Sequence, residues 1–334
     1  MTTMTGRHTA REMDKRGDPW MTELATIRHE FETRMAELLP DSAGGSDALA
    51  AAMRAGTLSA GKRMRPLLLM LVARDLGCAS PALVDIACAV EMVHAASLIL
   101  DDMPCMDNAM LRRGQPTIHV QYGEDVAVLA SVALLSRAFG VLATAPDVPP
   151  AVRARLVAKL AETVGSAGLV RGQFEDLRAG AQRSEQDIAT TNELKTGVLL
   201  GVSVDMAAIL AETDDCVAQS LRAFALAAGH AFQIRDDFLD DPSVAPGLAA
   251  NEAGKDTGKD LGKATLVNAL GFDEARRRLA HHLDEADRKL TEAIGREQRT
   301  RRFVDTLFGA GAGFRFAHGT GAGSAGAGSE QVRH

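Results

Sequence analysis

The chain is poor in aromatic residues, with one Trp and one Tyr among 334 residues. β-Sheets favour β-branched and aromatic side chains, whereas Ala, Leu and Met, which are abundant here, favour helices. Apolar residues make up 46% of the chain, which is enough to form a sizeable core. The composition therefore predicts a helical protein rather than one built on sheets.

Three further absences exclude whole classes of protein. The net charge is -7, and a nucleic-acid-binding protein of low sequence specificity needs a basic surface instead. The four cysteines form no CxxC pair, which is typical of reduced thiols in a cytoplasmic protein. Residues 1–20 contain no apolar core of a secretory signal, and no apolar run approaches the roughly 20 residues that span a bilayer. We expect a cytoplasmic protein without a membrane span.

The spacing of apolar residues predicts a series of long helices. Apolar residues three and four apart predict a first helix at about 21–39, which Pro40 ends. Ser80-Pro81 is typical of a helix start, and the helix that it opens can run unbroken to Leu100. No convincing strand pattern is found, so we expect an all-α fold packed around a central space. Further helices are expected at 62–76, 124–142, 150–179, 184–211, 214–241 and 272–307.

Composition also predicts the limits of the folded part. Residues 1–19 are polar and of mixed charge, and we interpret them as a flexible leader. Residues 309–334 are almost entirely Gly, Ala, Ser and polar residues, which cannot bury enough apolar surface to offset the entropy lost on ordering. We expect one helical domain over 20–308, followed by a disordered tail.

Two acidic clusters lie within otherwise apolar helical segments, at 101–107 and 236–240. Asp236 and Asp240 are four residues apart and share a helix face, where like charges repel by a few tenths of a kcal/mol. One such cluster is more often a solvated acidic surface, but two inside apolar helices favour a metal site. Carboxylates suit Mg²⁺, which also bridges to substrate phosphates. The clusters therefore predict a magnesium and diphosphate site.

Basic residues are interleaved with the acidic clusters. Arg binds phosphate with two parallel hydrogen bonds, while Lys acts as a point charge. Each basic residue alone is an ordinary surface cation, and a lone His94 on a helix is more often a core histidine. The combination of cations with two acidic clusters favours anion binding. The cations concerned are Lys62, Arg63, Arg65, Arg112, Arg113 and Lys195, with the Gly- and Lys-rich segment 254–263.

From about Leu24 to Phe308 the chain resembles the trans-isoprenyl diphosphate synthases, and is most like the bacterial carotenoid-type geranylgeranyl diphosphate synthases. The order and spacing of the shared motifs are highly specific. These motifs are GKRMRP (61–66), LDDMPCMD (100–107), LRRGQPT (111–117), GQFEDL (172–177), KT (195–196), FQIRDDFLD (232–240) and the Gly- and Lys-rich segment 254–263.

The resemblance implies a single-domain, all-α bundle of antiparallel helices around a deep central cavity, assembled as a homodimer. It implies Mg²⁺-dependent, head-to-tail condensation of isopentenyl diphosphate with dimethylallyl, geranyl or farnesyl diphosphate to give geranylgeranyl diphosphate. The implied magnesium ligands are Asp101, Asp107 and Asp236, with Asp102 and Asp240 in support. The implied catalytic residues are these five together with Asp237 and Lys195.

The resemblance also assigns substrate contacts and product length. Ala96 is five residues before Asp101, roughly 7.5 Å along the helix axis. Related bacterial farnesyl synthases have an aromatic floor at this position, so the small Ala96 and Ser97 imply a longer product. Implied contacts of the allylic diphosphate are Arg112, Lys195, Thr196, Gln233, Lys255 and Lys263; those of isopentenyl diphosphate are Lys62, Arg65, His94 and Arg113.

The chain departs from the family in three places, and alternatives stay open. Ala60 stands where a second Gly often precedes the GKR at residues 61–63. The first motif is DDxxxxD, longer than the common DDxxD, and only two residues separate Asp260 from Lys263, which leaves the roles of Lys259 and Lys263 open. A farnesyl diphosphate synthase would use the same chemistry. A non-catalytic partner subunit would be expected to lose the acidic residues that are kept here. A terpene cyclase or a head-to-head enzyme is the last alternative, and a cyclase would be expected to carry an Asn/Ser/Glu motif in place of the second cluster.

Overall fold

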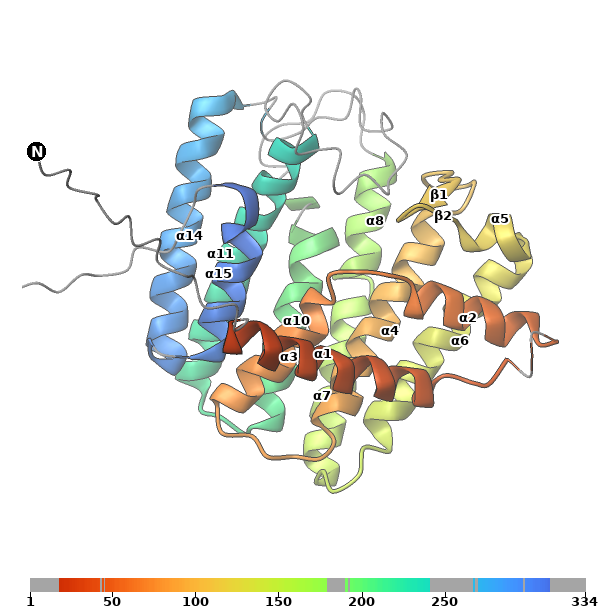
Figure 1. Ribbon diagram of the computed structural model, residues 1–334, viewed down its shortest axis with the longest axis horizontal. Coiled ribbons are helices and arrows are strands. Elements are labelled where there is room, and N and C mark those ends of the chain that lie inside the picture. The colour runs from red at the N-terminus through yellow and green to blue at the C-terminus, as the bar shows by residue number, and fades with distance from the viewer. Residues whose placement is uncertain are drawn as a thin grey trace, which may run out of the picture. The chain divides into compact units, whose positions relative to one another are not determined.

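The computed structural model describes residues 18–42, 44, 46–178, 190–191, 193–240, 267, 270–296 and 298–312, with the backbone alone for 195, 196, 239, 240 and 309–312. These residues form two compact units that divide after Leu160. Both units are built from helices (Figure 1), which confirms the predicted all-α class. The segment 254–263, with Lys255, Lys259 and Lys263, lies outside the described residues, as do residues 1–17 of the predicted leader and most of the predicted tail.

The first unit contains long and short helices and a small hairpin. Its elements are α1 (Pro19–Leu38), α2 (Ala48–Leu58), α3 (Met64–Asp75), α4 (Leu83–Asp101), β1 (Leu111–Arg112), β2 (Gln115–Pro116), α5 (Ile118–Tyr122), α6 (Glu124–Ala143) and most of α7 (Pro150–Val164).

Helix α4 is the core of this unit, and α1, α2, α3 and α6 all pack against it. It contains neither Gly nor Pro, and most of its residues are buried. The hydroxyl of Ser80 accepts a hydrogen bond from the backbone N–H of Ala82 at 3.3 Å, close to the predicted start. Each fully buried Leu, Ile or Val side chain contributes about 1.5–3 kcal/mol, so α4 gives the unit a rigid centre.

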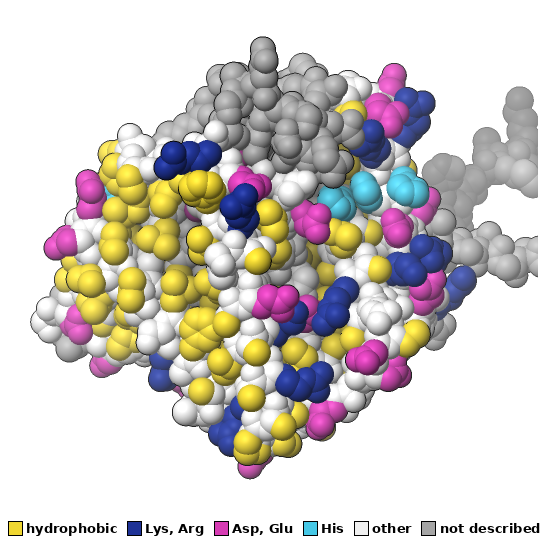
Figure 2. Space-filling view, turned by 180° about the vertical axis from the view of Figure 1, so that it is seen from behind, with side chains coloured by type: hydrophobic (Ala, Val, Ile, Leu, Met, Phe, Trp, Pro, Cys, Tyr) yellow, Lys and Arg dark blue, Asp and Glu magenta, His cyan; other side chains and the backbone are white. Residues whose placement is uncertain are grey.

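Two helices among the described residues are long and apolar enough to cross a membrane by length and composition, namely α4 and α6. For α4, 72% of the apolar window is buried, as expected of a core helix, whereas for α6 the figure is 39%. The exposed side of α6 carries Val128, Leu129 and Val132. Figure 2 shows many apolar side chains on the face that it draws, chiefly in its left half.

The hairpin of β1 and β2 was not predicted from the sequence. Its strands pair Arg112 with Gln115, which leaves Arg113 and Gly114 as a two-residue turn. Both turn residues have positive φ, at 54° and 75°, as a type I′ turn requires. Strands of two residues carry no period-2 pattern, so only the turn could have indicated the hairpin.

The second unit consists of α8 (Leu169–Arg178), a π-helical turn η2 (Glu193–Gly197), α10 (Val198–Leu210), α11 (Asp215–Asp240), α14 (Phe272–Ile294) and α15 (Arg299–Ala312). Helices α11 and α14 pack along each other, and α14 buries an apolar stripe at spacings of three and four that begins at Ala275 and ends at Leu290. The guanidinium of Arg235 on α11 donates to the carbonyl oxygen of Leu307 on α15 at 2.7 Å. This contact holds the C-terminal helix against α11.

Two predicted helices are each divided by glycines. The expected helix 150–179 is interrupted at residues 165–168, where a side chain on Gly168 would lie 2.1 Å from the carbonyl oxygen of Thr163. The expected helix 272–307 is interrupted at Gly295, which has a φ of 82°. Helix α15 then continues to Ala312, past residue 308 where the sequence predicted the helical domain to end.

A stacked histidine pair makes the second unit sensitive to acid. The rings of His230 and His282 lie 5.0 Å apart between α11 and α14. Burial, followed by the nearby His230 and His281, lowers the pKa of His282 to about 4. An unfolded histidine has a pKa of about 6.5, so stability is full above pH 6.5 and is lost as the pH falls towards 4.

We therefore predict that the free energy of unfolding, measured with urea, falls by about 1 kcal/mol between pH 7 and pH 4.5 on account of His282, allowing for solvent screening of this half-exposed ring. In the His282→Gln variant, the part of the fall in unfolding free energy that comes from His282 should be absent. The exposed His29 on α1 supplies a control, because His29→Gln should leave the pH dependence unchanged. Equal curves for His282→Gln and the parent protein would contradict the prediction.

Candidate active site

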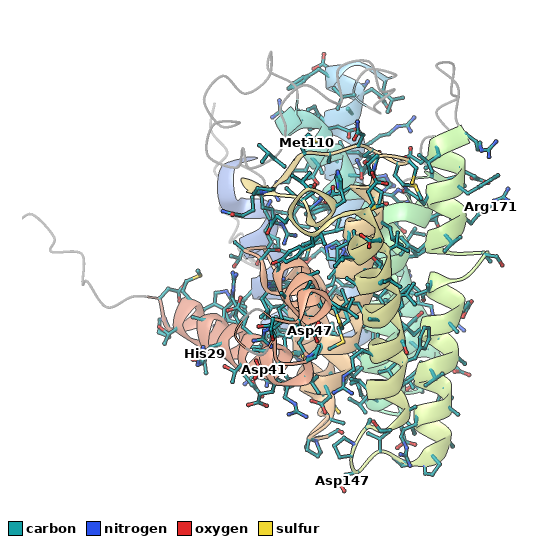
Figure 3. The ribbon with its side chains drawn as sticks, turned by 90° about the vertical axis from the view of Figure 1, so that its right-hand side faces the viewer. His29, Asp41, Asp47, Met110, Asp147 and Arg171 are labelled. Atoms are coloured by element: carbon teal, nitrogen blue, oxygen red, sulfur yellow. The ribbon has the colours of Figure 1, made fainter. Side chains whose placement is uncertain are left out.

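The first acidic cluster lies where α4 ends. Asp101 is the last residue of α4, and the loop that follows folds back so that the N–H of Asp107 donates to the carbonyl oxygen of Asp101 at 2.9 Å. Both carboxylates are half-buried. In Figure 3, Met110 at the end of this loop lies at the opposite end of the unit from Asp147, which connects α6 to α7. The two implied magnesium ligands of this cluster therefore lie together at one end of the core helix, Asp101 as its last residue and Asp107 in the loop that follows.

Asp102 is buried and paired with Arg112. Its Oδ1 accepts from Nη2 of Arg112 at 2.6 Å, and its Oδ2 accepts from Nε at 2.7 Å. Burial is the largest single influence and lowers the pKa of Arg112, but the hydrogen bonds to Asp102 together with the negative charges of Asp102, Asp101 and Asp107 outweigh it and raise the pKa of the guanidinium. The sequence predicted a metal-supporting role for Asp102 and a substrate contact for Arg112, and here the two residues bind each other.

Arg113 packs against the segment Gly61–Arg63, here called the GKR segment. Its left-handed backbone conformation in the hairpin turn directs the guanidinium onto Gly61, where an added Cβ would lie 2.5 Å from Nη1 and 2.9 Å from Cζ. Only glycine leaves room for this contact. The consecutive arginines of the hairpin therefore contact different partners: Arg112 binds Asp102, and Arg113 packs against Gly61.

His94 lies among these arginines as a neutral ring. Its Nε2 is 3.2 Å from Nη1 of Arg65, and because arginine only donates, Nε2 is the acceptor and Nδ1 carries the proton. Burial, followed by the positive charges of Arg65, Arg113 and Arg112, holds the pKa of His94 well below its usual range. Nδ1 is buried and has no hydrogen-bond partner among the described residues.

Sequence reasoning gave Arg63 no individual role, yet it is the most buried cation of this cluster. Its backbone is left-handed, with a φ of 49° at the start of α3, and its Nη1 donates to Oε1 of Glu91 at 2.9 Å. Both side chains are 5% exposed. The signal that could have found this pair was Glu91, an acidic residue inside the apolar helix that leads to His94.

The structure brings four of the predicted residues together: Arg65, His94, Arg112 and Arg113. Lys62 is exposed in the same segment. Ser97 is half-buried and lies four residues before Asp101, on the same face of α4, whereas Ala96 is fully buried. The predicted role of Ala96 and Ser97 in product length stays a prediction.

The second acidic cluster belongs to the other unit. Asp236 is half-buried near the end of α11, and the buried Asp237 accepts from Nε2 of Gln233, one turn earlier, at 3.1 Å. Lys195 and Thr196 lie in the π-helical turn η2, a distortion that is frequent at functional sites. The side chains of Lys195, Thr196 and Asp240 lie outside the described part of the chain, so their predicted roles stay predictions.

The carboxylates present suit magnesium in its phosphate-bridged form. No group of three His, Cys, Asp or Glu side chains among the described residues is gathered as a complete metal cage. Mg²⁺ does not need one, because it keeps several waters and binds through one or two carboxylates together with substrate phosphates. Asp101 and Asp107 in one loop provide such a pair.

Comparison with known proteins agrees with this geometry. Residues 46–302 match the family described as polyprenyl synthetase. The chain belongs to the polyprenyl synthetase family. It is 48% identical over 290 residues to the geranylgeranyl diphosphate synthase of Pseudescherichia vulneris, covering 86% of this chain and 92% of that protein. It is 39% identical over 264 residues to the farnesyl diphosphate synthase of Geobacillus stearothermophilus, covering 78% and 86%.

A solved structure supports the same assignment of the fold. The geranyltransferase from Helicobacter pylori, complexed with magnesium and isoprenyl diphosphate, superposes with a TM-score of 0.73 at 28% identity, covering 88% of this chain and 99% of that one. The resemblance to prenyl diphosphate synthases inferred from the motifs is therefore confirmed at the level of family and fold.

In this polyprenyl synthetase, we predict that Gly61→Ala impairs substrate binding while preserving the fold. The new Cβ would push the Arg113 guanidinium away, and a displacement of about 1 Å at a binding group costs at least tenfold in kcat/KM. The melting temperature should change little, because the displaced atoms are the end of a flexible side chain. Steady-state kinetics and thermal denaturation measure the two effects.

Gly201→Ala is the matched control, since no atom lies within 4 Å of its added Cβ. In the middle of α10 this change should be neutral or stabilise by about 0.5–1 kcal/mol, with normal kinetics. If Gly61→Ala retained full activity, the contact between Gly61 and Arg113 would have no part in binding.

Proposed function

We propose that this polyprenyl synthetase is a geranylgeranyl diphosphate synthase, which condenses isopentenyl diphosphate head to tail with dimethylallyl, geranyl or farnesyl diphosphate. The relative with this activity is more similar to the chain than the farnesyl synthase reported above. Farnesyl diphosphate synthase is the second candidate, because it uses the same chemistry and is also a relative.

The observation that carries the proposal is the basic cluster around His94. Four guanidinium groups, those of Arg63, Arg65, Arg112 and Arg113, lie close enough to lower its pKa. Carboxylates pair with two of these arginines: Glu91 with Arg63, which Glu32 also approaches at 3.8 Å, and Asp102 with Arg112. The guanidinium groups gathered beside His94 suit a diphosphate, which presents several oxygens and more than one negative charge.

Different residues would bind isopentenyl diphosphate and assist the departure of diphosphate from the allylic substrate. Lys62, Arg65, His94 and Arg113 bind isopentenyl diphosphate and orient its double bond. Arg112 stabilises the negative charge that develops as the allylic carbon–oxygen bond breaks. The double bond then attacks the allylic carbocation, and the released diphosphate takes up the proton that is lost. Exclusion of water protects the cation from hydrolysis.

Magnesium is proposed as the cofactor. In the first unit, Asp101 and Asp107 would hold it, with Asp102 in support. For Asp236, with Asp240 in support, the role of magnesium ligand stays the one that the family resemblance implies. When bound, Mg²⁺ neutralises the leaving diphosphate as a Lewis acid. The proposal rests on the carboxylate chemistry of both clusters and on the magnesium that the Helicobacter pylori geranyltransferase contains.

A homodimer in the cytoplasm is also proposed, and α6 supports the assembly. Leu129 and Val132 on its outer face are 57% and 58% exposed. Together with the exposed Val128 they place three large apolar side chains on one helix face, and contiguous apolar surface of this kind can form an interface. A second copy of the chain is the occupant that the family resemblance implies.

The proposed activity is tested by incubating the pure protein with Mg²⁺, isopentenyl diphosphate and each allylic primer. We expect the twenty-carbon diphosphate as the main product by chain-length analysis. Asp101→Ala and Asp236→Ala should each lower kcat by about 10²–10³-fold or more, since each removes charge that stabilises the transition state. Their helical circular dichroism should persist, and a chelator should abolish wild-type activity until Mg²⁺ is restored.

A main product of fifteen carbons would favour the farnesyl synthase. Near-normal turnover by either Asp variant would show that its cluster does not bind the metal.

For the assembly, we expect sedimentation to give the mass of two chains, and the double variant Leu129→Glu, Val132→Glu to give the mass of one. Buried glutamates would be strongly unfavourable in an apolar interface. Met21→Glu on the exposed side of α1 is a control that should stay dimeric. A double variant of unchanged mass would place the interface elsewhere.

Product length is expected to depend on the face of α4 that lies below Asp101. Ser97→Tyr places an aromatic ring on that face and should shift the main product from twenty to fifteen carbons. Ala96→Tyr is predicted from the sequence to do the same, but because Ala96 is fully buried it should also cost about 1–3 kcal/mol of stability by overpacking. Product analysis with melting temperatures separates the two effects. If both folded variants still made the twenty-carbon product, the floor would lie on another element.

A further inference from the structure

The segment Ser59–Arg63 is held by two arginines that bind its carbonyl groups. Nη2 of Arg28 on α1 donates to the carbonyl oxygen of Gly61 at 2.8 Å. Nη2 of Arg63 donates back to the carbonyl oxygen of Ser59 at 2.6 Å. Since Lys62 lies between these anchored residues and α3 begins directly after them, the two contacts determine where Lys62 and Arg65 are presented.

Two carboxylates hold the arginines in turn. Oε1 of Glu32 accepts from Nε of Arg28 at 2.9 Å and lies 3.8 Å from Nε of Arg63. Oε1 of Glu91 accepts from Nη1 of Arg63 at 2.9 Å, and this pair is almost fully buried. The segment is therefore tied to α1 through Glu32 and to α4 through Glu91.

Glu91 lies three residues before His94, so both project from the same side of α4. Arg63 and Arg65 contact these two residues respectively, at 2.9 Å and 3.2 Å. Two contacts, Arg63 with Glu91 and Arg65 with His94, therefore join the GKR segment and the start of α3 to α4. The second carries residues proposed to bind diphosphate, and the first is too buried to do so.

We infer that Glu91 and Arg63 are positioning residues for the diphosphate of isopentenyl diphosphate. This inference rests on the proposed function. The pair sets the distance between α4 and the GKR segment, and through it the distance from His94 to Lys62, Arg65 and the Gly61-supported Arg113. A diphosphate bound by these four groups needs all of them at the correct spacing.

Charge and position predict opposite effects of Glu91→Gln on the KM for isopentenyl diphosphate. Removing the charge of Glu91 makes the cluster more positive, which by itself would attract a diphosphate more strongly and lower KM. Loss of the cross-link loosens the segment and raises KM. Arg63→Lys keeps the charge and loses the planar fork that holds Glu91 and Ser59 together, so its effect is positional.

The experiment compares Glu91→Gln and Arg63→Lys with Asp85→Asn as the matched control. Asp85 is a buried carboxylate on the same helix, and it pairs with Arg34 of α1 at 2.6 Å. We expect Glu91→Gln and Asp85→Asn to lower the melting temperature by several degrees each. Glu91→Gln and Arg63→Lys should raise KM for isopentenyl diphosphate about tenfold or more, as misplacement of binding groups does. KM for the allylic substrate should change less than about twofold, and Asp85→Asn should change neither KM.

Three outcomes would overturn the inference: a lower KM for isopentenyl diphosphate in Glu91→Gln, equal increases in both KM values, or the same increase in Asp85→Asn. If Glu91→Gln does not fold, the KM of Arg63→Lys decides alone. If the wild-type protein condenses no substrates, the proposed function fails. The inference is then decided by calorimetric affinity for inorganic pyrophosphate, which both variants should weaken and Asp85→Asn should not.

Discussion

The repulsion among four guanidinium groups around one histidine is the constraint on which the candidate site depends. Arg63, Arg65, Arg112 and Arg113 gather in a partly buried region where like charges interact more strongly than in water. Two features make this arrangement tolerable: carboxylates pair with two of the arginines, and His94 stays neutral. What is left is a preorganised site at which several guanidinium groups could hold one anion together.

Helix α4 carries most of the residues that pair with these arginines or lie beside them. It carries Asp85, Glu91, His94 and Asp101 along one rigid element, and Asp102 follows directly. Buried ionic groups are costly unless they are paired, and each buried carboxylate here has an arginine from another element. Asp85 binds Arg34 of α1, and Glu91 binds Arg63 at the start of α3. The same pairs that satisfy the core helix therefore fix its neighbours in position.

Much of this could be predicted from the sequence, and the exceptions have physical causes. Apolar periodicity located α1, α3, α4, α6 and α11, because these helices bury long stripes. It missed the break before α8, where Gly168 approaches the carbonyl oxygen of Thr163 too closely for a side chain, and the break at Gly295, where φ is positive. Motifs identified the arginines, but no pattern along the chain could show that Arg112 and Arg113 bind different partners, since this depends on a turn of two residues with positive φ. The sequence predicted no individual role for Arg63, because that role depends on a contact with Glu91, 28 residues away.

The pairing of Asp102 with Arg112 fits an enzyme that must bind and then release a charged group. Without an anion, the buried Asp102 and the half-buried Arg112 have each other as partners, so neither is left unsatisfied. A diphosphate would offer Arg112 a second set of oxygens in the same geometry, because the guanidinium fork matches carboxylate and phosphate alike. Complete exchange would leave the carboxylate of Asp102, which is 4% exposed, without its arginine and would therefore be costly. In the proposed mechanism, Arg112 would therefore keep its contact with Asp102 while it binds the leaving diphosphate.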